Sequence, residues 1–184
     1  MGVPPPTTTP IYFPLGNNLA TTSDVIQVLG PETSGEVEYA LVFEEDGAIY
    51  VTVASDHSDR AAERHGIQLS KQLYPDVLAP EVWPYEEVRP HWERLVLRCW
   101  TTSDRQRKLY QEAALAELLS PEEWFPRLRE EGIQQPGLVF LSGTPATLGG
   151  LVFADAYDLE LEDPVRGRSI RHQYRVEVLG PGRQ

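Results

Sequence analysis

The sequence predicts an α+β fold that is mainly β, with a few helices inserted in the middle of the chain. Residues 37–43 and 49–53 are rich in β-branched and aromatic residues, and a glycine-containing turn separates them. The last third of the chain returns to short apolar runs, whereas residues 104–130 have the spacing of helices. Because 184 residues with 41% hydrophobic content can bury one substantial core, we expect a single domain over residues 1–184.

Proline and threonine dominate residues 1–10. Repeated prolines exclude regular helix and inner strand, so this stretch is predicted to be an extended arm. Residues 11–14 and 25–29 carry short apolar runs and are predicted to be strands.

The turn at residues 45–47, Glu-Asp-Gly, sets the register of the central hairpin. It fits a three-residue loop closed by a glycine in the left-handed region. Counting back along both strands places Glu36 opposite Asp56, whereas a two-residue turn would send Asp56 to the core face, where an unpaired carboxylate is costly. The preferred register assigns these side chains to the core face: Val37, Tyr39, Leu41, Phe43, Ile49, Val51 and Val53.

Three carboxylates then meet on the other face of the hairpin, those of Glu36, Glu38 and Asp56. Opposed residues have Cβ atoms about 4.5–5.5 Å apart, so these groups repel one another unless a cation lies among them. Oxygen ligands favour Mg²⁺, Mn²⁺ or Ca²⁺ over zinc. The alternative is that these acids are solvated surface residues of an acidic chain.

The middle of the chain contains the predicted helices. Residues 104–119 place Leu109, Ala113, Ala116 and Leu119 on one stripe and are predicted to form the longest helix. Ser-Pro-Glu-Glu at residues 120–123 then resembles a capping box that opens a second helix.

The remaining elements are shorter. A helical turn or two is expected at residues 59–65, and the second of the longer helices is expected to stop at Gly132. The other expected strands are residues 92–100, 138–141, 151–154, 159–161 and 173–179.

Charge and cysteine content restrict the partners. A net charge of −12 and a pI near 4.7 argue against binding nucleic acid or an anionic membrane. Cys99 is the only cysteine, so no intrachain disulfide can form. With neither a signal sequence nor an apolar run of membrane-spanning length, the chain is expected to be cytoplasmic.

Several motifs follow one another in a characteristic order. They are E-x-E at residues 36–38, S-D-H-S-D-R at 55–60, S-K-Q at 70–72, G-T-P at 143–145 and D-P-x-x-x-R-x-I-x-H-x-Y at 163–174. This order resembles the fumarylacetoacetate hydrolase superfamily, and most closely an uncharacterised branch of it. The resemblance covers most of the chain from Ser34 onward, without the lid segment that usually precedes E-x-E.

The resemblance implies a mixed β-sandwich or roll of the fumarylacetoacetate hydrolase C-terminal domain type, usually a homodimer. It implies Mg²⁺, or Mn²⁺ or Ca²⁺, held by Glu36, Glu38 and Asp56. Enzymes of the family act on 2-oxo acids or β-dicarbonyl carboxylates, as hydrolases, decarboxylases or tautomerases. A small-molecule 2-oxo acid is therefore the expected partner, with the metal stabilising an enolate.

Four further residues receive roles from the resemblance. Lys71 would neutralise or protonate the enolate as the catalytic residue. Gly143 and Thr144 would hold the substrate carboxylate. Arg60 would orient a carboxylate or brace the ligands, or else serve only as the structural partner of Asp59 or Glu63.

The histidines are interpreted as structural. His57 alternates onto the face opposite Asp56, so it is expected to pack rather than ligate, and His91 and His172 stand alone in the sequence.

The chain also departs from the family pattern. Ser55 and Glu63 stand where the family has Asn and Gln, and no histidine precedes His57, with Asp24 and Glu32 the nearby upstream acids. Hydrolysis through an activated water is therefore in doubt, whereas decarboxylation or tautomerisation could proceed with the metal and Lys71, or with groups from a partner subunit. The alternative function is a non-catalytic module for binding or assembly.

Overall fold

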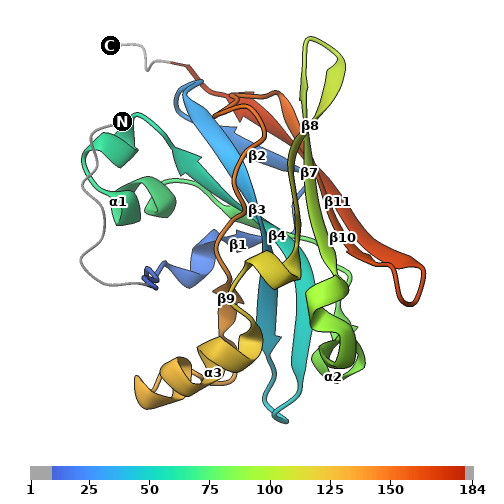
Figure 1. The fold of residues 1–184 in the computed structure, drawn as a ribbon. Coiled ribbons are helices and arrows are strands. Elements are labelled where there is room, and N and C mark those ends of the chain that lie inside the picture. The colour runs from blue at the N-terminus through green and yellow to red at the C-terminus, as the bar shows by residue number, and fades with distance from the viewer. Residues whose placement is uncertain (1–9, 181–184) are drawn as a thin grey trace.

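Two β-sheets form the fold, as Figure 1 shows. The computed structural model describes residues 10–180, so the predicted arm at residues 1–10 lies, apart from Pro10, outside the described residues. Strands make up 43% and helices 20% of the structure, which confirms the mainly β, mixed-sheet prediction.

The first sheet has the strand order β1-β5-β4-β3-β9, with β6 paired to β4, and the second has the order β2-β11-β10-β7-β8. The elements are η1 Asn17–Leu19, β1 Ala20–Thr21, β2 Val25–Val28, β3 Thr33–Phe43, β4 Ile49–Asp59, η2 Ala62–Arg64, α1 Ile67–Gln72, β5 Asp76–Leu78, β6 Trp83–Pro84, α2 Tyr85–Val88, η3 Arg89–Arg94, β7 Val96–Ser103, β8 Gln106–Ala114, η4 Leu115–Glu117, α3 Pro121–Glu130, β9 Val139–Leu141, β10 Ala156–Asp163 and β11 Arg168–Val178.

The long hairpin of β3 and β4 confirms the predicted register. Glu36 pairs with Asp56 in the ladder, and Gly47 has a φ of 86° in the closing turn. The Glu44 N–H donates to the Ala48 carbonyl at 2.9 Å, which fixes the three-residue loop. The length and type of the turn therefore decide which side chains of both strands face the core and which lie on the opposite face of the sheet.

The core lies between the two sheets. Every residue assigned to the core face of the hairpin contributes to it, six of them buried and Ile49 partly buried. The second sheet supplies Tyr157, Leu159 and Ile170, and Tyr39 meets Trp92 edge to face at 4.9 Å. On its other face the first sheet carries a smaller apolar cluster, Ala40, Ala54 and Leu78, which borders the acidic residues.

The predicted helix at residues 104–119 is wrong, because these residues form β8 and the short η4. Asp104 and Arg105 have φ values of 50° and 63°, and Ser103 pairs with Gln106, as in a two-residue type I′ hairpin turn. Pairing with β7 therefore overrides the helical stripe of apolar residues, and Leu109 is 38% exposed.

A β-bulge explains why the pattern of this strand misleads. Cys99 pairs with Gln111 whereas Trp100 pairs with Leu109, so Tyr110 is an extra residue on β8. Tyr110 and Gln111 are consequently both buried, although they are adjacent. The bulge breaks the two-residue period and turns Gln111 toward the first sheet.

We expect the double substitution Asp104→Asn and Arg105→Gly to stabilise the fold by about 0.5–1 kcal/mol, because both positions have positive φ and Asn-Gly suits this turn. Urea unfolding measures the change. Gln106→Gly, one residue into the strand, is the control and should destabilise the fold by a similar amount. A destabilised double variant would contradict the assignment of the turn.

The other predicted elements are largely confirmed. The helix α3 begins behind Ser120 with the expected capping box, Gly132 follows it with a φ of 69°, and η2 lies within residues 59–65. The remaining predicted strands correspond to β2, β7, β9, β10 and β11.

Residues 11–14 and 151–154 are not strands, contrary to prediction. In the second segment the Tyr157 hydroxyl donates to the Val152 carbonyl at 3.0 Å, so a side chain takes the place of a ladder partner. In the first, the Pro14 carbonyl accepts from Gln68 at 2.9 Å, and proline cannot donate to a ladder.

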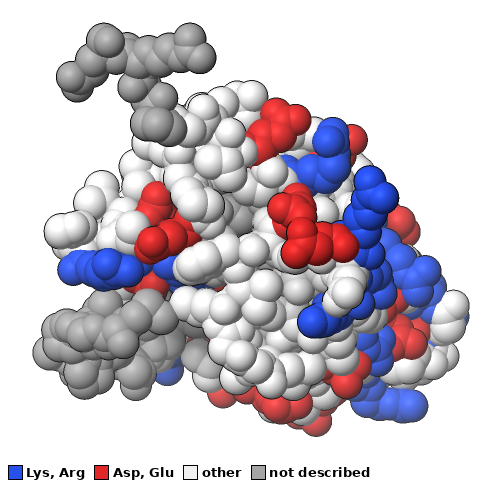
Figure 2. Space-filling model, turned by 90° about the horizontal axis from the view of Figure 1, so that it is seen from above, with Lys and Arg blue, Asp and Glu red and all other residues white. Residues whose placement is uncertain are grey.

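Charged side chains of both signs lie close together on the surface. Figure 2 shows basic side chains gathered along one side, with acidic side chains among them. On the outer face of the second sheet Arg171 pairs with Glu160 at 2.6 Å and Arg107 with Asp158 at 2.9 Å. Within residues 10–180 no helix has the length and apolar character needed to cross a membrane.

Candidate metal centre

Three carboxylates converge on the face of the first sheet that points away from the main core. Glu36 and Glu38 project from β3 and Asp56 from β4, and one oxygen of each lies within 4.8 Å of the others. Glu38 and Asp56 are 4% and 5% exposed. The cluster is therefore a buried site, and the alternative of solvated surface acids does not hold for these two residues.

The Glu38 carboxyl is the most perturbed group of the cluster. Burial raises its pKa well above the usual value, and the charge of Asp56 raises it further, against the opposing effects of Lys71 and the Gly143 N–H. That N–H donates to Glu38 Oε2 at 2.6 Å. A cation bound to Glu38 and Asp56 would remove this like-charge repulsion.

Lys71 reaches the cluster from the last turn of α1. Its ammonium group forms an ion pair with Asp56 and lies 3.7 Å from Glu36 Oε2. Burial by itself lowers the pKa of Lys71, but the charges of Asp56, Glu36 and Glu38 raise the pKa overall. Lys71 is therefore protonated at neutral pH and places a positive charge beside the cluster.

Arg60 braces Glu36. Its Nη2 lies 2.8 Å from Glu36 Oε1, its Nη1 lies 3.2 Å from Glu63 Oε2, and its Nε donates to Ser34 Oγ at 2.7 Å. The guanidinium is buried, so these contacts fix the Glu36 carboxylate. Arg60 thus pairs with both Glu36 and Glu63, and its role in bracing a metal ligand stays a prediction.

The G-T-P loop lies against the strand that carries both glutamates. Besides the contact of Gly143 with Glu38, the Thr144 hydroxyl donates to the Val37 carbonyl at 2.9 Å. This hydroxyl is thus already engaged with the backbone. The structure places Gly143 and Thr144 at the site. Their contact with a substrate carboxylate stays a prediction.

Gln111 joins these elements and was missed from the sequence. Its side-chain oxygen accepts from the Val37 N–H at 3.1 Å, and its amide donates to Thr144 Oγ1 and to the Pro145 carbonyl, both at 2.7 Å. Because Val37 separates the two glutamates, Gln111 fixes the backbone that holds them. No local pattern signals this role, since it depends on the bulge in β8.

His57 lies behind the site, as predicted. It is fully buried, and its ring nitrogens contact the Tyr174 hydroxyl at 3.0 Å and Thr33 Oγ1 at 2.9 Å. Burial lowers the pKa of His57 to about 3, helped by the charge of Arg60, so the ring is neutral and structural.

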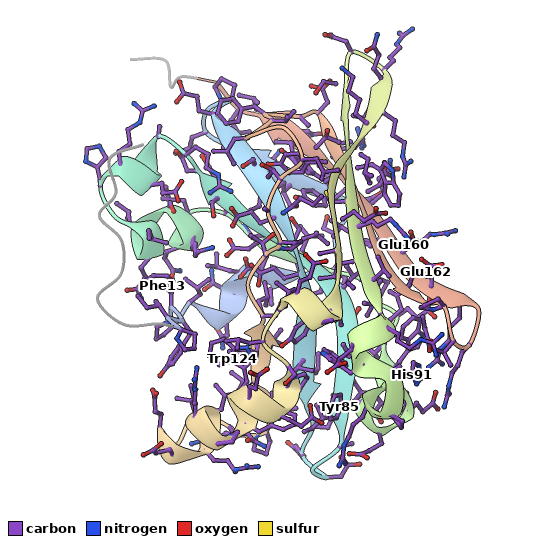
Figure 3. The ribbon with its side chains drawn as sticks, viewed as in Figure 1. Phe13, Tyr85, His91, Trp124, Glu160 and Glu162 are labelled. Atoms are coloured by element: carbon purple, nitrogen blue, oxygen red, sulfur yellow. The ribbon has the colours of Figure 1, made fainter. Side chains whose placement is uncertain are left out.

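His91 and His172 lie elsewhere. His91 contacts Asp163 at 2.9 Å and lies near Tyr85 in the lower right of Figure 3, whereas Phe13 lies on the left. His172 lies 3.3 Å from the Ser23 carbonyl.

The donor set fits a hard divalent cation. All three groups offer oxygen, and those of Glu38 and Asp56 are buried. Arg60 pairs with Glu36 and Lys71 pairs with Asp56, whereas Glu38 has no ion pair among the described residues. Mg²⁺ and Mn²⁺ prefer such carboxylate oxygens, whereas zinc prefers nitrogen and sulfur.

The upstream acids do not join the centre. Glu32 pairs with Arg64 at 3.4 Å, and its side chain is 52% exposed. The Asp24 carbonyl accepts from the Arg175 N–H at 2.9 Å. Residues 10–35 contain no histidine, so this part of the described chain supplies no histidine that could pair with an acid to activate water.

Several solved structures share the fold of this chain. A hexagonal crystal form of 2-keto-3-deoxyarabinonate dehydratase has a TM-score of 0.64 and 17% identity, covering 90% of this chain and 58% of that one. The 2-keto-3-deoxy-D-arabinonate dehydratase complexed with magnesium and 2,5-dioxopentanoate has a TM-score of 0.65 and 16% identity, with coverage of 91% and 62%. The structure of Cg1458 has a TM-score of 0.61 and 18% identity, with coverage of 86% and 66%.

The chain thus spans less than two thirds of the length of these proteins. The likeness confirms the fold that the motif order predicted. No curated protein shows significant sequence similarity to the chain. A family profile described as "Protein of unknown function (DUF2848)" matches residues 1–174.

Proposed function

The chain belongs to the DUF2848 family of proteins of unknown function, and we propose that it is a metal-dependent enzyme of the hydrolase or lyase type. Its substrate would be a 2-oxo acid or a β-dicarbonyl carboxylate. The observation that carries this proposal is the cluster of Glu36, Glu38 and Asp56, whose oxygens lie within 4.8 Å of one another beside the ammonium group of Lys71.

The chemistry follows from the donor set. Mg²⁺ or Mn²⁺ held by the three carboxylates would supply Lewis-acid stabilisation of the enolate formed when a bond next to the 2-oxo group breaks. Lys71, protonated and paired with Asp56, provides positive charge and a proton for the developing enolate. Arg60 and Gln111 hold the strand and the Glu36 carboxylate in place, so that the site is preorganised.

One neighbour supports this assignment by more than its fold. The 2-keto-3-deoxy-D-arabinonate dehydratase was solved with magnesium and 2,5-dioxopentanoate, a small carboxylate with a 2-oxo group. The same sheet arrangement therefore holds a metal and a 2-oxo acid in that protein. We extend the metal and this substrate class to the present chain as a proposal.

Decarboxylation and double-bond migration fit the site better than hydrolysis. Hydrolysis needs a group that activates water. Among the described residues Glu32 forms an ion pair with Arg64, and no histidine lies in residues 10–35. Proton transfer by Lys71 needs no such group.

Oxalate, a stable mimic of a 2-oxo acid enolate, tests the proposal by calorimetry. We expect oxalate to bind only when Mg²⁺ is present. Lys71→Met should weaken oxalate binding about tenfold, as expected for loss of a charge-assisted contact, and should abolish metal-dependent turnover of 2-oxo acids. Lys108→Met is the matched control, since Lys108 is exposed on β8 and is the only other lysine.

The remaining outcomes separate the alternatives. Mg²⁺ binding without oxalate binding would favour a non-catalytic module that keeps the metal for binding or assembly. Equal Mg²⁺ binding by the wild type and Glu36→Ala would contradict the proposed ligands.

A further inference from the structure

A cavity of about 360 Å³ adjoins the metal centre. Asp56 lines it together with Asp76, and its other walls are largely apolar, including Phe13, Leu78 and Leu141. Figure 3 places Phe13 on the side of the molecule where β1 and α1 lie. The cavity is therefore continuous with one carboxylate of the proposed metal site and extends away from it along an apolar surface.

Asp76 lies in line with the metal ligands across three strands. In the antiparallel pairing of β4 and β5, Ala54 faces Leu78 and Ser55 faces Val77, so the next position of each strand places Asp76 beside Asp56. Glu36 lies on the other side of Asp56 in β3. Neighbouring strands are about 4.8 Å apart, so Asp76 lies one strand away from Asp56 and two strands away from Glu36. Its side chain lines the cavity at this position.

The Asp76 carboxyl lacks a partner for one of its oxygens. The residue is 6% exposed, and Oδ1 makes no hydrogen bond to any described residue. Leaving a buried acceptor unpaired costs about 1–3 kcal/mol. A fold that places such a group at the wall of a cavity retains a binding contact that a ligand can complete.

The geometry indicates which ligand group the carboxyl suits. Oδ1 is an acceptor without a partner among the described residues, so the group that completes it must donate a hydrogen bond. Because the other walls of the cavity are largely apolar, a neutral donor such as a hydroxyl group fits them better than a charged one.

Residues 12–17, which line the cavity, are fixed to the rest of the fold. The Pro14 carbonyl accepts from Gln68 and the Gly16 N–H donates to Gln72 at 3.1 Å, so the wall segment is tied to α1. The Tyr12 hydroxyl donates to Glu131 just beyond α3. The cavity thus has a defined apolar shape and can select the chain that it holds.

We infer that Asp76 is a specificity-determining residue that binds a hydroxyl group on an otherwise apolar substrate chain. This inference rests on the proposed function, because the cavity would receive the part of a 2-oxo acid that extends beyond the metal. A site built to hydrogen-bond a hydroxyl discriminates strongly against the analogue that lacks it, because its own polar group then stays buried and unpaired.

Matched ligands test the inference by calorimetry with Mg²⁺ present. We expect 4-hydroxy- or 5-hydroxy-2-oxopentanoate to bind the wild type about tenfold or more tightly than 2-oxopentanoate. In Asp76→Leu this preference should fall below about twofold, whereas Asp76→Asn should keep part of it. Asp76→Leu should also raise the melting temperature of the metal-free protein, because it removes an unpaired buried polar group.

Oxalate separates failure of this inference from failure of the proposed function, since it can occupy the metal centre without entering the cavity. Absence of oxalate binding by the wild type would refute the proposed function. Oxalate binding without a preference for either hydroxylated ligand, or with a preference that survives in Asp76→Leu, would overturn the role of Asp76. Binding of two Mn²⁺ ions per chain that falls to one in Asp76→Asn would show a second metal site instead. The wild-type comparison needs no variant, so the inference stays testable if Asp76→Leu fails to fold.

Discussion

Glu38→Gln is expected to lower the affinity for Mn²⁺ by about 100-fold or more. Loss of a partner outside the coordination shell already costs about 10–100-fold, and Glu38 is itself one of the three oxygen donors. The neutral amide also removes a charge that the buried, acidic site disfavours. The metal-free variant should therefore melt at a higher temperature than the metal-free wild type.

Two measurements check this result. Calorimetric titration with Mn²⁺ gives the affinity, and melting curves with and without Mn²⁺ give the stabilisation by the metal, about 2.7 kcal/mol for the wild type when the metal is at 100 times its Kd. Glu45→Gln, on the exposed turn of the same hairpin, is the control and should behave as the wild type. Undiminished Mn²⁺ binding by Glu38→Gln would remove Glu38 from the ligand set.

Gly35→Ala is expected to destabilise the fold by about 1–3 kcal/mol, the usual cost of overpacking. A Cβ at this position would collide with the Tyr174 hydroxyl and would lie 2.6 Å from Ser55 Oγ. These two hydroxyl groups contact each other at 2.8 Å, and His57 joins them. Since Gly35 precedes Glu36, the displacement should also weaken metal binding.

A double-mutant cycle isolates this collision. Tyr174→Phe removes the obstructing hydroxyl, so Gly35→Ala should cost less in the Tyr174→Phe background than in the wild type. Gly30→Ala is the matched control, because a Cβ there meets nothing within 4 Å, and its stability should change by less than about 0.5 kcal/mol. Urea unfolding of the four proteins gives the coupling energy, and additive effects would contradict the proposed contact.

The sequence allows the three carboxylates to be placed together because the information is local. A turn at residues 45–47 and the alternation of side chains determine the whole ladder between Glu36 and Asp56. An error of one residue would have exchanged the two faces of the hairpin. The observed register matches the predicted one because the glycine at the third loop position leaves little choice of turn.

Non-local pairing explains what the sequence did not reveal. Residues 104–119 have a helical stripe of apolar side chains, yet the bulge at Tyr110 and pairing with β7 place them in a sheet. Gln111 and Asp76 were overlooked for the same reason. Their positions beside the acidic cluster follow from contacts between strands that are distant in the chain, and single polar residues within a strand carry no local signal of such contacts.

Gln111 and the G-T-P loop have a consequence for the solution behaviour of the protein. Pairing of β9 with β3 covers only Ala40, Leu41 and Val42, so the outer edge of β3 near Val37 has no strand beside it in residues 10–180. There the Val37 N–H and carbonyl bond to the side chains of Gln111 and Thr144, and the Tyr39 carbonyl accepts from the Ser142 N–H. An open strand edge is a template for intermolecular pairing and aggregation. The same contacts that hold the two glutamates therefore close this edge against the addition of a foreign strand.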